Sequence, residues 1–311
     1  MLWSWWITCS GLERSTPLGS DRGACLSGLV GTASAYASAT VVNAIATGRG
    51  AAFGVDLKVH ARVELIPGSK RITGELVGGK RESPRLIETC VKKVLRYLKL
   101  EGTYGATVRT KSEFPIAVGL SSSSAAANAA VLATFAALEK SPPPELVLDL
   151  GIDAAFEAGV TITGALDDAA ASLYGRGVVT DNTARKVLKF FDLDPRLKIL
   201  IYVPPGKFYT SKVKRERLRQ ITDGVEFAHE MAMRGDVFGA LSLNGVLYSS
   251  ALGYDPLPAL EAMAGGALSS GLTGTGPAVV AVAKPGDVGK IERAWRRRTG
   301  KVIITKPASK L

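Results

Sequence analysis

The stretch from Pro115 to Asn128, PIAVGLSSSSAAAN, joins a glycine turn and four consecutive serines to the start of an alanine-rich helix. The first amides of a helix have no partner within the helix, and the helix dipole gives them partial positive charge. Serine hydroxyls add hydrogen-bond donors and can bind Mg²⁺. One serine is enough to cap a helix, so a run of four predicts a phosphate-binding loop. We expect Gly119 to approach phosphate too closely for a side chain at that position.

The size and charge of the chain limit the class of protein. Its 311 residues, 46% of them hydrophobic, are enough for two globular domains. Lysine and arginine outnumber aspartate and glutamate by 39 to 28, and the net charge of +11 suits anionic small molecules and nucleic acid alike. Only 7% of the residues are aromatic, and few of these stand among the basic ones, so no nucleic-acid partner is predicted.

Cysteine and histidine usage excludes several kinds of site. Three scattered cysteines, Cys9, Cys25 and Cys90, lack metal-binding spacing and indicate a reduced, cytoplasmic protein. Two histidines, His60 and His229, are too few for a His-rich metal site and offer little to a Ser-His-Asp triad. No apolar run reaches transmembrane length, so no membrane partner is predicted.

Hydrophobic periodicity predicts an α+β fold in two halves. In the first half, strands are expected over 33–43, 51–63, 105–111, 177–180 and 186–191. Helices are expected over 84–98, 145–158 and 164–174, and from the serine loop to about Leu138. In the second half, strands over 197–203, 268–273, 278–283 and 301–305 alternate with helices between 210 and 264 and over 288–298. That order is ferredoxin-like. The domain boundary is placed near 192–196, giving domains over 30–194 and 195–311.

One motif points to a different nucleotide-binding fold. The run from Gly74 to Lys80, GELVGGK, matches the first seven positions of a Walker A loop, but Arg81 stands where Ser or Thr should bind Mg²⁺. Pro84 also follows too soon for the loop to open directly into its helix. A hairpin turn is therefore the prediction for this run.

The serine loop resembles the second signature of the GHMP kinases, the small-molecule kinases of galactose, homoserine, mevalonate and phosphomevalonate. That signature is a proline, a short spacer and Gly-Leu-Ser-Ser-Ser-Ala. In the family this loop wraps the ATP phosphates, and a serine near its end, here Ser124, assists Mg²⁺. The resemblance implies that the ATP-binding residues are Pro115, Gly119, Leu120, Ser121, Ser122, Ser123, Ser124 and Ala125. The extended form GLSSSSAAANA looks most like the archaeal shikimate kinase branch.

Three further segments support the resemblance. ATVVNAIATGRG over 39–50, TGALDDA over 163–169 and LTGTGPA over 272–278 resemble the first motif, the catalytic-aspartate segment and the third motif of that branch. The resemblance runs from about Ala33 to the C-terminus and implies a two-domain GHMP kinase fold, with a ribosomal S5 domain 2-like N-terminal domain and a ferredoxin-like C-terminal domain. The implied active-site loop residues are Thr40, Asn43, Thr273, Gly274, Thr275 and Gly276.

Phosphoryl transfer to an alcohol needs phosphate donors, Mg²⁺ ligands and a carboxylate near the hydroxyl. Asp168 lies seven residues before Gly175, which matches the family's spacing and favours it over Asp167 as the base. Glu157 lies eleven residues before Asp168, where related kinases place an acidic Mg²⁺ ligand. The simpler interpretations are a helix cap for the two aspartates and a solvated side chain for Glu157. Some members of the family lack the aspartate and rely on positioning alone.

The resemblance implies ATP-dependent phosphorylation of shikimate to shikimate 3-phosphate, in chorismate and aromatic amino acid biosynthesis, with ATP and Mg²⁺ as cofactors. The shikimate carboxylate needs a facing cation, and Arg49, Lys207 and Lys212 are candidates by position. The alternatives are a GHMP kinase for another small alcohol, such as homoserine, and a basic RNA- or ribosome-associated protein. The oligomeric state, a homodimer included, is left open.

Residues 1–29 have no counterpart in the resemblance and make a poor signal peptide. The segment is rich in tryptophan and aperiodic, and we expect a disordered extension outside the fold. Val30 stands where the family's first strand should begin, and a GTG start codon would read as valine inside a longer frame. We therefore expect the natural protein to start at or near Val30. The alternative is a genuine tail that docks Trp3, Trp5 and Trp6 on a surface.

Overall fold

The computed structural model describes residues 29–79, 82–206 and 215–309. The predictions for residues 1–28, Lys207 and Lys212 lie outside these described residues. None of the described helices is long and apolar enough to cross a membrane.

The first half of the chain forms a six-stranded sheet with the path β3-β4-β2-β5-β6, and β1 pairs with β2 beside this path. The strands are β1 (Leu29–Val42), β2 (Arg49–Pro67), β3 (Ile72–Val77), β4 (Tyr104–Ser112), β5 (Gly177–Asp181) and β6 (Lys186–Phe191). All pairs are antiparallel except β3 with β4. The long β2 pairs with β1 along one edge and with β5 and then β4 along the other, so it forms the centre of the sheet.

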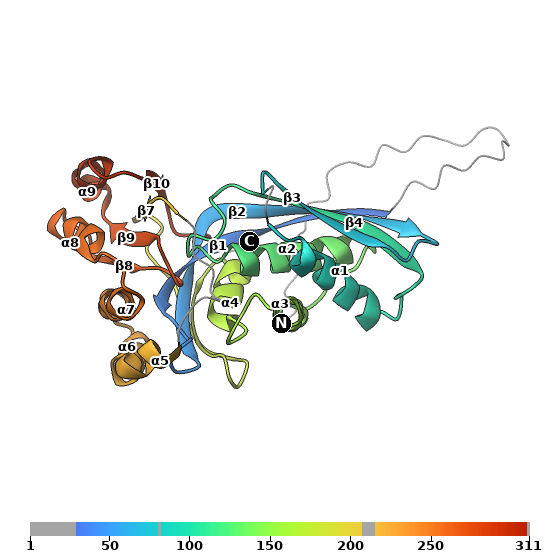
Figure 1. The fold of residues 1–311 in the computed structure, drawn as a ribbon, viewed down its shortest axis with the longest axis horizontal. Helices are drawn as coiled ribbons and strands as arrows, with labels where there is room; N and C mark the ends of the chain where they lie inside the picture. Colours follow the sequence, from blue (N-terminus) through green and yellow to red (C-terminus); the bar gives the residue numbers. More distant parts are fainter. Residues whose placement is uncertain (1–28, 80–81, 207–214, 310–311) are drawn as a thin grey trace.

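Four helices pack together on one face of this sheet (Figure 1). They are α1 (Arg85–Tyr97), α2 (Ser122–Ala137), α3 (Pro144–Ala158) and α4 (Leu166–Tyr174). The central helix is α2, whose alanines let the sheet and the other helices come close from several sides. At the tightest approach a Cβ on Gly31 of β1 would overlap Ala133 O of α2. This close packing fixes α2 against β1.

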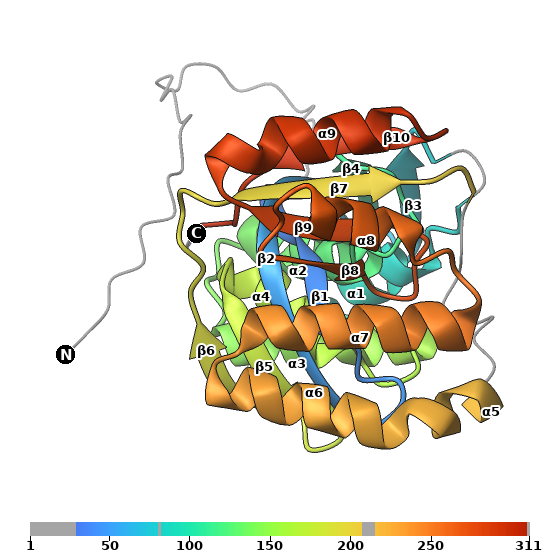
Figure 2. The same cartoon turned by 90° about the vertical axis from the view of Figure 1, so that its left-hand side faces the viewer.

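The second domain has a four-stranded antiparallel sheet of order β10-β7-β9-β8. Its elements are β7 (Lys198–Val203), α5 (Arg215–Leu218), η2 (Arg219–Ile221), α6 (Thr222–Arg234), α7 (Val237–Leu252), α8 (Leu257–Ala264), β8 (Ser269–Leu272), β9 (Val279–Ala283), η3 (Pro285–Asp287), α9 (Val288–Arg296) and β10 (Lys301–Thr305). With the strands numbered within the domain, the spatial order is 4-1-3-2, which confirms the ferredoxin-like prediction. Residues of α8 and α9 form a small core against one face of the sheet (Figure 2).

The two domains share one hydrophobic core. Residues of β7 and β9 on the opposite face, such as Ile201 and Val280, belong to the same cluster as β1 and α2. The predicted boundary lies in the link between β6 and β7. The end of the chain then returns to the first domain, where Ala308 N donates to Gly54 O at 2.9 Å. The second domain is therefore held to the first by its core and by its C-terminal residues.

The prediction of a hairpin turn over Gly74 to Lys80 is wrong in its first half. Gly74 to Val77 belong to β3, an edge strand that runs parallel to β4. Parallel neighbours need a crossover connection, which α1 supplies. A strand cannot wrap phosphates, so the Walker A match has no structural counterpart in the described residues.

Candidate active site

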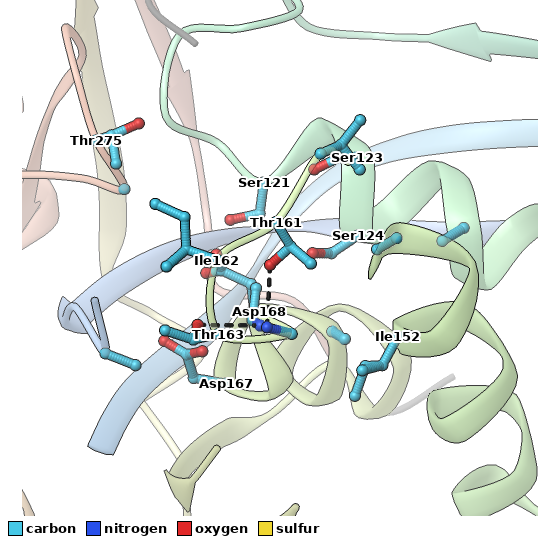
Figure 3. A pocket seen from close by; sticks show the side chains of 18 of the residues that line it. Ser121, Ser123, Ser124, Ile152, Thr161, Ile162, Thr163, Asp167, Asp168 and Thr275 are labelled. Atoms are coloured by element: carbon cyan, nitrogen blue, oxygen red, sulfur yellow. Dashed lines mark hydrogen bonds between the residues drawn. The ribbon is translucent and has the colours of Figure 1, made fainter. Parts of the chain in front are cut away.

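A polar pocket opens where the serine loop, β1, α4 and the second domain meet (Figure 3). Its lining residues come from four stretches that are far apart in sequence. They are Thr40 of β1 with 43–45 after it; Ala117, Gly119, 121–124, 127 and 128 of the serine loop and α2; 151, 152 and 155 of α3 with 160–165 and 167–169 leading into α4; and Gly274 with Thr275. The motifs that the sequence singled out therefore converge on one pocket.

The serine loop turns sharply before α2. Gly119 has a φ of +96°, and Ser121, the residue before the helix, has a φ of +53°. No side chain caps the first amides of α2. Ser121 Oγ is buried and makes no hydrogen bond of regular geometry to a described residue. Free amides, a buried serine hydroxyl and the helix dipole together suit an anion.

The predicted phosphate-binding residues divide into two groups. Gly119 and the four serines line the pocket. Leu120 and Ala125 point into the core, with 1% and 0% of their surface exposed, and Pro115 lines a separate cavity behind the loop. The second group thus shapes the loop without reaching the pocket.

Hydrogen bonds across the domain junction hold the motifs together. Thr273 Oγ1 donates to Gly119 O at 3.0 Å and accepts from Thr40 N at 3.0 Å. Thr40 Oγ1 in turn accepts from Gly274 N at 2.9 Å. The two threonine hydroxyls therefore join the first, second and third motifs.

Asn43 also forms hydrogen bonds across the domain junction. Its Nδ2 donates to Gly274 O at 2.8 Å, and its Oδ1 accepts from Ile45 N at 3.0 Å. Its backbone carbonyl accepts from the Tyr248 hydroxyl at 2.8 Å, and its backbone amide donates to Asn244 Oδ1 at 2.9 Å. Like the two threonines, Asn43 builds the wall of the pocket through bonds to the protein.

Gly119 lies in close contact with the second domain. A Cβ on Gly119 would overlap Thr273 O. The glycine is required because the second domain lies against the serine loop at this point. The close approach of phosphate to Gly119 stays a prediction beside this contact within the protein.

The two aspartates begin α4 and face different surroundings. Asp168 is half-buried, lines the pocket and accepts a hydrogen bond from Ser38 Oγ of β1 at 3.1 Å. Asp167 is only 4% exposed and accepts from Asn182 Nδ2 at 2.8 Å. Thr180 Oγ1 donates to Asn182 Oδ1 at 2.7 Å, which orients the amide. The geometry thus gives Asp168 the more open position of the two.

Burial raises the pKa of both carboxyls. For Asp168, burial is the larger cause and the neighbouring Asp167 the second, while the nearby hydroxyls of Ser121 and Ser38 oppose them, and the resulting pKa is about 7. Burial also raises the pKa of Asp167, against the Asn182 amide that favours its charged form. A carboxyl that titrates near neutrality can accept a proton at physiological pH.

Two predicted charged residues lie elsewhere. Glu157 is not among the pocket residues, since it lies on the side of α3 that faces α1 and pairs with Lys93 Nζ at 2.9 Å. Arg49 is exposed and does not line the pocket. None of the described lining residues carries a positive side chain. Across the described ranges, no group of three or more His, Cys, Asp or Glu side chains could hold a metal ion.

A second, more apolar cavity adjoins the serine loop. It shares Ser122 and Ser123 with the first pocket and extends between β3, β4 and α1. Its apolar lining includes Leu76, Leu86, Ile87 and Ile116. The serines therefore lie between a polar pocket and an apolar one.

Ser38 and Asn182, which bind the two aspartates, were not among the predicted site residues. Neither lies in a recognisable motif. Ser38 is one residue of a small-residue strand, and only its pairing in the sheet brings it opposite α4. Asn182 follows β5 in a turn, where asparagine is common for local reasons.

The chain matches known families over both domains. The model described as GHMP kinases N terminal domain matches residues 85–176, and GHMP kinases C terminal matches residues 258–301. The shikimate kinase of Methanosarcina mazei is 45% identical over 89% of this chain and 94% of its own length. That of Methanocella arvoryzae is 42% identical over 87% and 91%. That of Halobacterium salinarum is 38% identical over 88% and 96%.

Solved structures show the same fold at much lower identity. A homoserine kinase from Cytophaga hutchinsonii superposes with a TM-score of 0.69 at 20% identity, covering 94% of this chain and 98% of that one. The mevalonate kinase of Methanococcus jannaschii gives a TM-score of 0.70 at 15% identity, covering 89% and 98%.

Proposed function

This chain belongs to the GHMP kinases and to their shikimate kinase branch, and from that premise we propose how its pocket performs the reaction. The reaction is transfer of the γ-phosphoryl group of ATP to a hydroxyl of shikimate, giving shikimate 3-phosphate for chorismate and aromatic amino acid biosynthesis. One observation carries the proposal: the serine loop and the Asp168 carboxyl line the same pocket.

ATP would lie across the serine loop. The free amides of α2 and the serine hydroxyls suit the phosphates. The adjoining apolar cavity, lined by Leu86 and Ile116 among others, suits the adenine ring. This placement directs the terminal phosphate into the polar pocket and towards α4.

Asp168 would act as the base for the attacking hydroxyl. Its carboxyl is held by Ser38 Oγ and faces the pocket, whereas Asp167 is enclosed and bound to Asn182. We therefore assign the proton acceptor to Asp168 and give Asp167 a supporting part: its carboxyl helps keep the pKa of Asp168 near neutrality.

The oxygen donors of the pocket fit Mg²⁺, which prefers hard oxygen ligands. Two buried oxygens near the pocket, Ser121 Oγ and Asn128 Oδ1, make no hydrogen bond of regular geometry within the described structure. Ser124, in the first turn of α2, would hold the ion, as the resemblance implied. When bound, Mg²⁺ neutralises charge on the phosphates.

A coupled ADP-release assay tests the proposal across shikimate, homoserine and mevalonate. ADP release is expected with shikimate and not with the other two alcohols. Faster turnover of homoserine would assign the chain to the alternative among the GHMP kinases. A cytoplasmic location is also part of the proposal and rests on the scattered cysteines.

A further inference from the structure

A buried amide oxygen near the pocket has no partner. Asn128 of α2 is 1% exposed, and its Nδ2 donates to Ala169 O at 2.9 Å. Because a carbonyl only accepts, the amide nitrogen must face Ala169, and Oδ1 must face away from it. Within the described structure Oδ1 makes no hydrogen bond. An unmet buried acceptor costs about 1–3 kcal/mol, so this oxygen calls for a hydrogen-bond donor or a cation.

The oxygen lies on the face of α2 that borders the pocket. Asn128 and Gly151 of α3 both line it, and a Cβ built on Gly151 would lie 3.7 Å from Oδ1. Ser124 and Asn128 are four residues apart in α2, so they share one face of the helix, and Ser121 stands directly before its first turn. Asn128 thus continues the line of pocket oxygens one turn beyond Ser124.

The charges around this line favour a cation. The described lining contains Asp167 and Asp168 and no positive side chain. From α3 the pocket receives only Gly151, Ile152 and Ala155, while Glu157 is paired with Lys93 on another side of that helix. Phosphate oxygens have no proton to give to Oδ1, whereas a divalent cation or the water that it carries can satisfy it.

We propose that Asn128 Oδ1 is part of the metal site and faces the divalent ion or its bound water, where a carboxylate from α3 would otherwise be expected. The inference rests on the proposed function, because it takes Ser124 as the neighbouring metal-binding residue. In this chain, α2 then supplies both oxygens, and the residue at 151 is small so that the ion's shell can reach Oδ1.

The test is a titration of the full-length protein with Mn²⁺ in the presence of ADP. Binding is measured as the loss of the electron paramagnetic resonance signal of free Mn²⁺. Asn128→Ala should weaken Mn²⁺ binding about tenfold, the lower range for loss of a group that supports a metal site. Asn128→Asp keeps an oxygen there and should bind Mn²⁺ as well as the wild type or more tightly. Since both variants lose the bond to Ala169 O, their difference isolates the oxygen.

Two further variants guard against misfolding and misassignment. Gly151→Ala adds a methyl group at ordinary contact distance from its neighbours and improves a helix interior. It should fold well and still weaken Mn²⁺ binding. Glu157→Gln removes a carboxylate outside the pocket and should leave Mn²⁺ binding unchanged within about twofold.

Wild-type Mn²⁺ affinity in both Asn128→Ala and Gly151→Ala would overturn the inference, and so would an equal loss in Asn128→Ala and Asn128→Asp. If Glu157→Gln alone weakened Mn²⁺ binding, the metal ligand would be Glu157 of α3 and not Asn128. In each case the wild-type protein would still phosphorylate shikimate. Failure of that reaction in the wild type would instead contradict the proposed function.

Discussion

Asp168 and Asp167 are neighbours in sequence but differ in what surrounds them. Ser38 and the open pocket face Asp168, whereas Asn182 binds Asp167 in the interior. The helical turn at the start of α4 sends consecutive side chains in different directions, and this separates the two carboxyls into an accessible and an enclosed group.

Replacing the proposed base should reduce turnover far more than binding. Asp168→Asn removes the proton acceptor and should lower kcat by about a hundredfold or more, with the KM for ATP nearly unchanged. Asp167→Asn keeps a group that Asn182 can approach and should lower kcat less. Steady-state kinetics of both variants check this. If Asp167→Asn is the more damaged, the roles are reversed, and if both stay active, positioning alone suffices.

The pKa of Asp168 predicts how rate depends on pH. The base must be ionised, and its pKa is about 7. The rate should therefore fall about tenfold per pH unit below 7, with a plateau above. The residual activity of Asp168→Asn should not show this fall in rate below pH 7. A pH-independent rate between 5 and 8 in the wild type would contradict the assignment.

The same shift predicts the pH dependence of stability. The folded state holds this proton more tightly than the unfolded chain, whose pKa is near the ordinary 3.8. Ionisation of Asp168 therefore lowers the free energy of unfolding as pH rises from 3.8 towards about 7, and the loss is complete above that. Asp168→Asn should have the higher melting temperature at pH 8, and the gain should vanish at pH 4.

At the scale of elements, the serine loop depends on the strand-to-strand turn of the second domain. Gly119 lies against Thr273 O, and Thr273 Oγ1 donates back to Gly119 O. The serine loop is therefore shaped from outside its own domain, by the turn that follows β8.

Gly119→Val should disrupt both the loop and the domain junction. The side chain meets Thr273 O and must adopt a φ of +96°. We expect loss of ATP binding and a lower melting temperature, measured by calorimetry. Gly253→Val is the control, because its φ is +75° but nothing lies within 4 Å of its Cβ. It should show only the cost of the backbone, about 1–3 kcal/mol, and bind ATP normally. Equal effects would argue against the clash.

At the scale of the whole molecule, α7 fastens the second domain to the loop after β1. Tyr248 of α7 is fully buried, and its hydroxyl donates to Asn43 O at 2.8 Å and accepts from Ala46 N at 3.1 Å. One hydroxyl thus forms hydrogen bonds with two backbone groups of the pocket wall, which lie about two hundred residues earlier in the chain.

Tyr248→Phe should leave those two groups unmet and cost about 1–3 kcal/mol for each buried group. The loop would lose its anchor, so KM values should rise along with the loss of stability in urea unfolding. Tyr202→Phe is the matched control, because its hydroxyl donates to Thr299 O at 2.8 Å, away from the pocket. That variant should lose stability with unchanged KM. An unchanged KM in Tyr248→Phe would show that the domain junction does not affect substrate binding in the pocket.

The sequence by itself determined nearly all the elements, with β3 the exception, and it singled out the serine loop. Helix and strand periods, the glycine turn and the serines act over a few residues, so local patterns suffice to read them. The ferredoxin-like order and nearly every helix were predicted in this way, and the resemblance carried by four short motifs gave the family that the comparisons bear out.

Only the tertiary structure decided which side chains reach the pocket. Thr40 N donates a hydrogen bond to Thr273 Oγ1, 233 positions later in the chain. This bond shows that two predicted pocket residues lie at the junction between the domains. Glu157 has the spacing of a metal ligand, yet the packing of α3 on α1 turns it to Lys93. No sequence pattern marked Asn128 as a site residue. Its orientation comes from the hydrogen bond to Ala169 O of α4 and from the neighbouring Gly151 of α3. Spacing fixes a residue's position along an element, whereas the packing of that element against others fixes the direction its side chain faces.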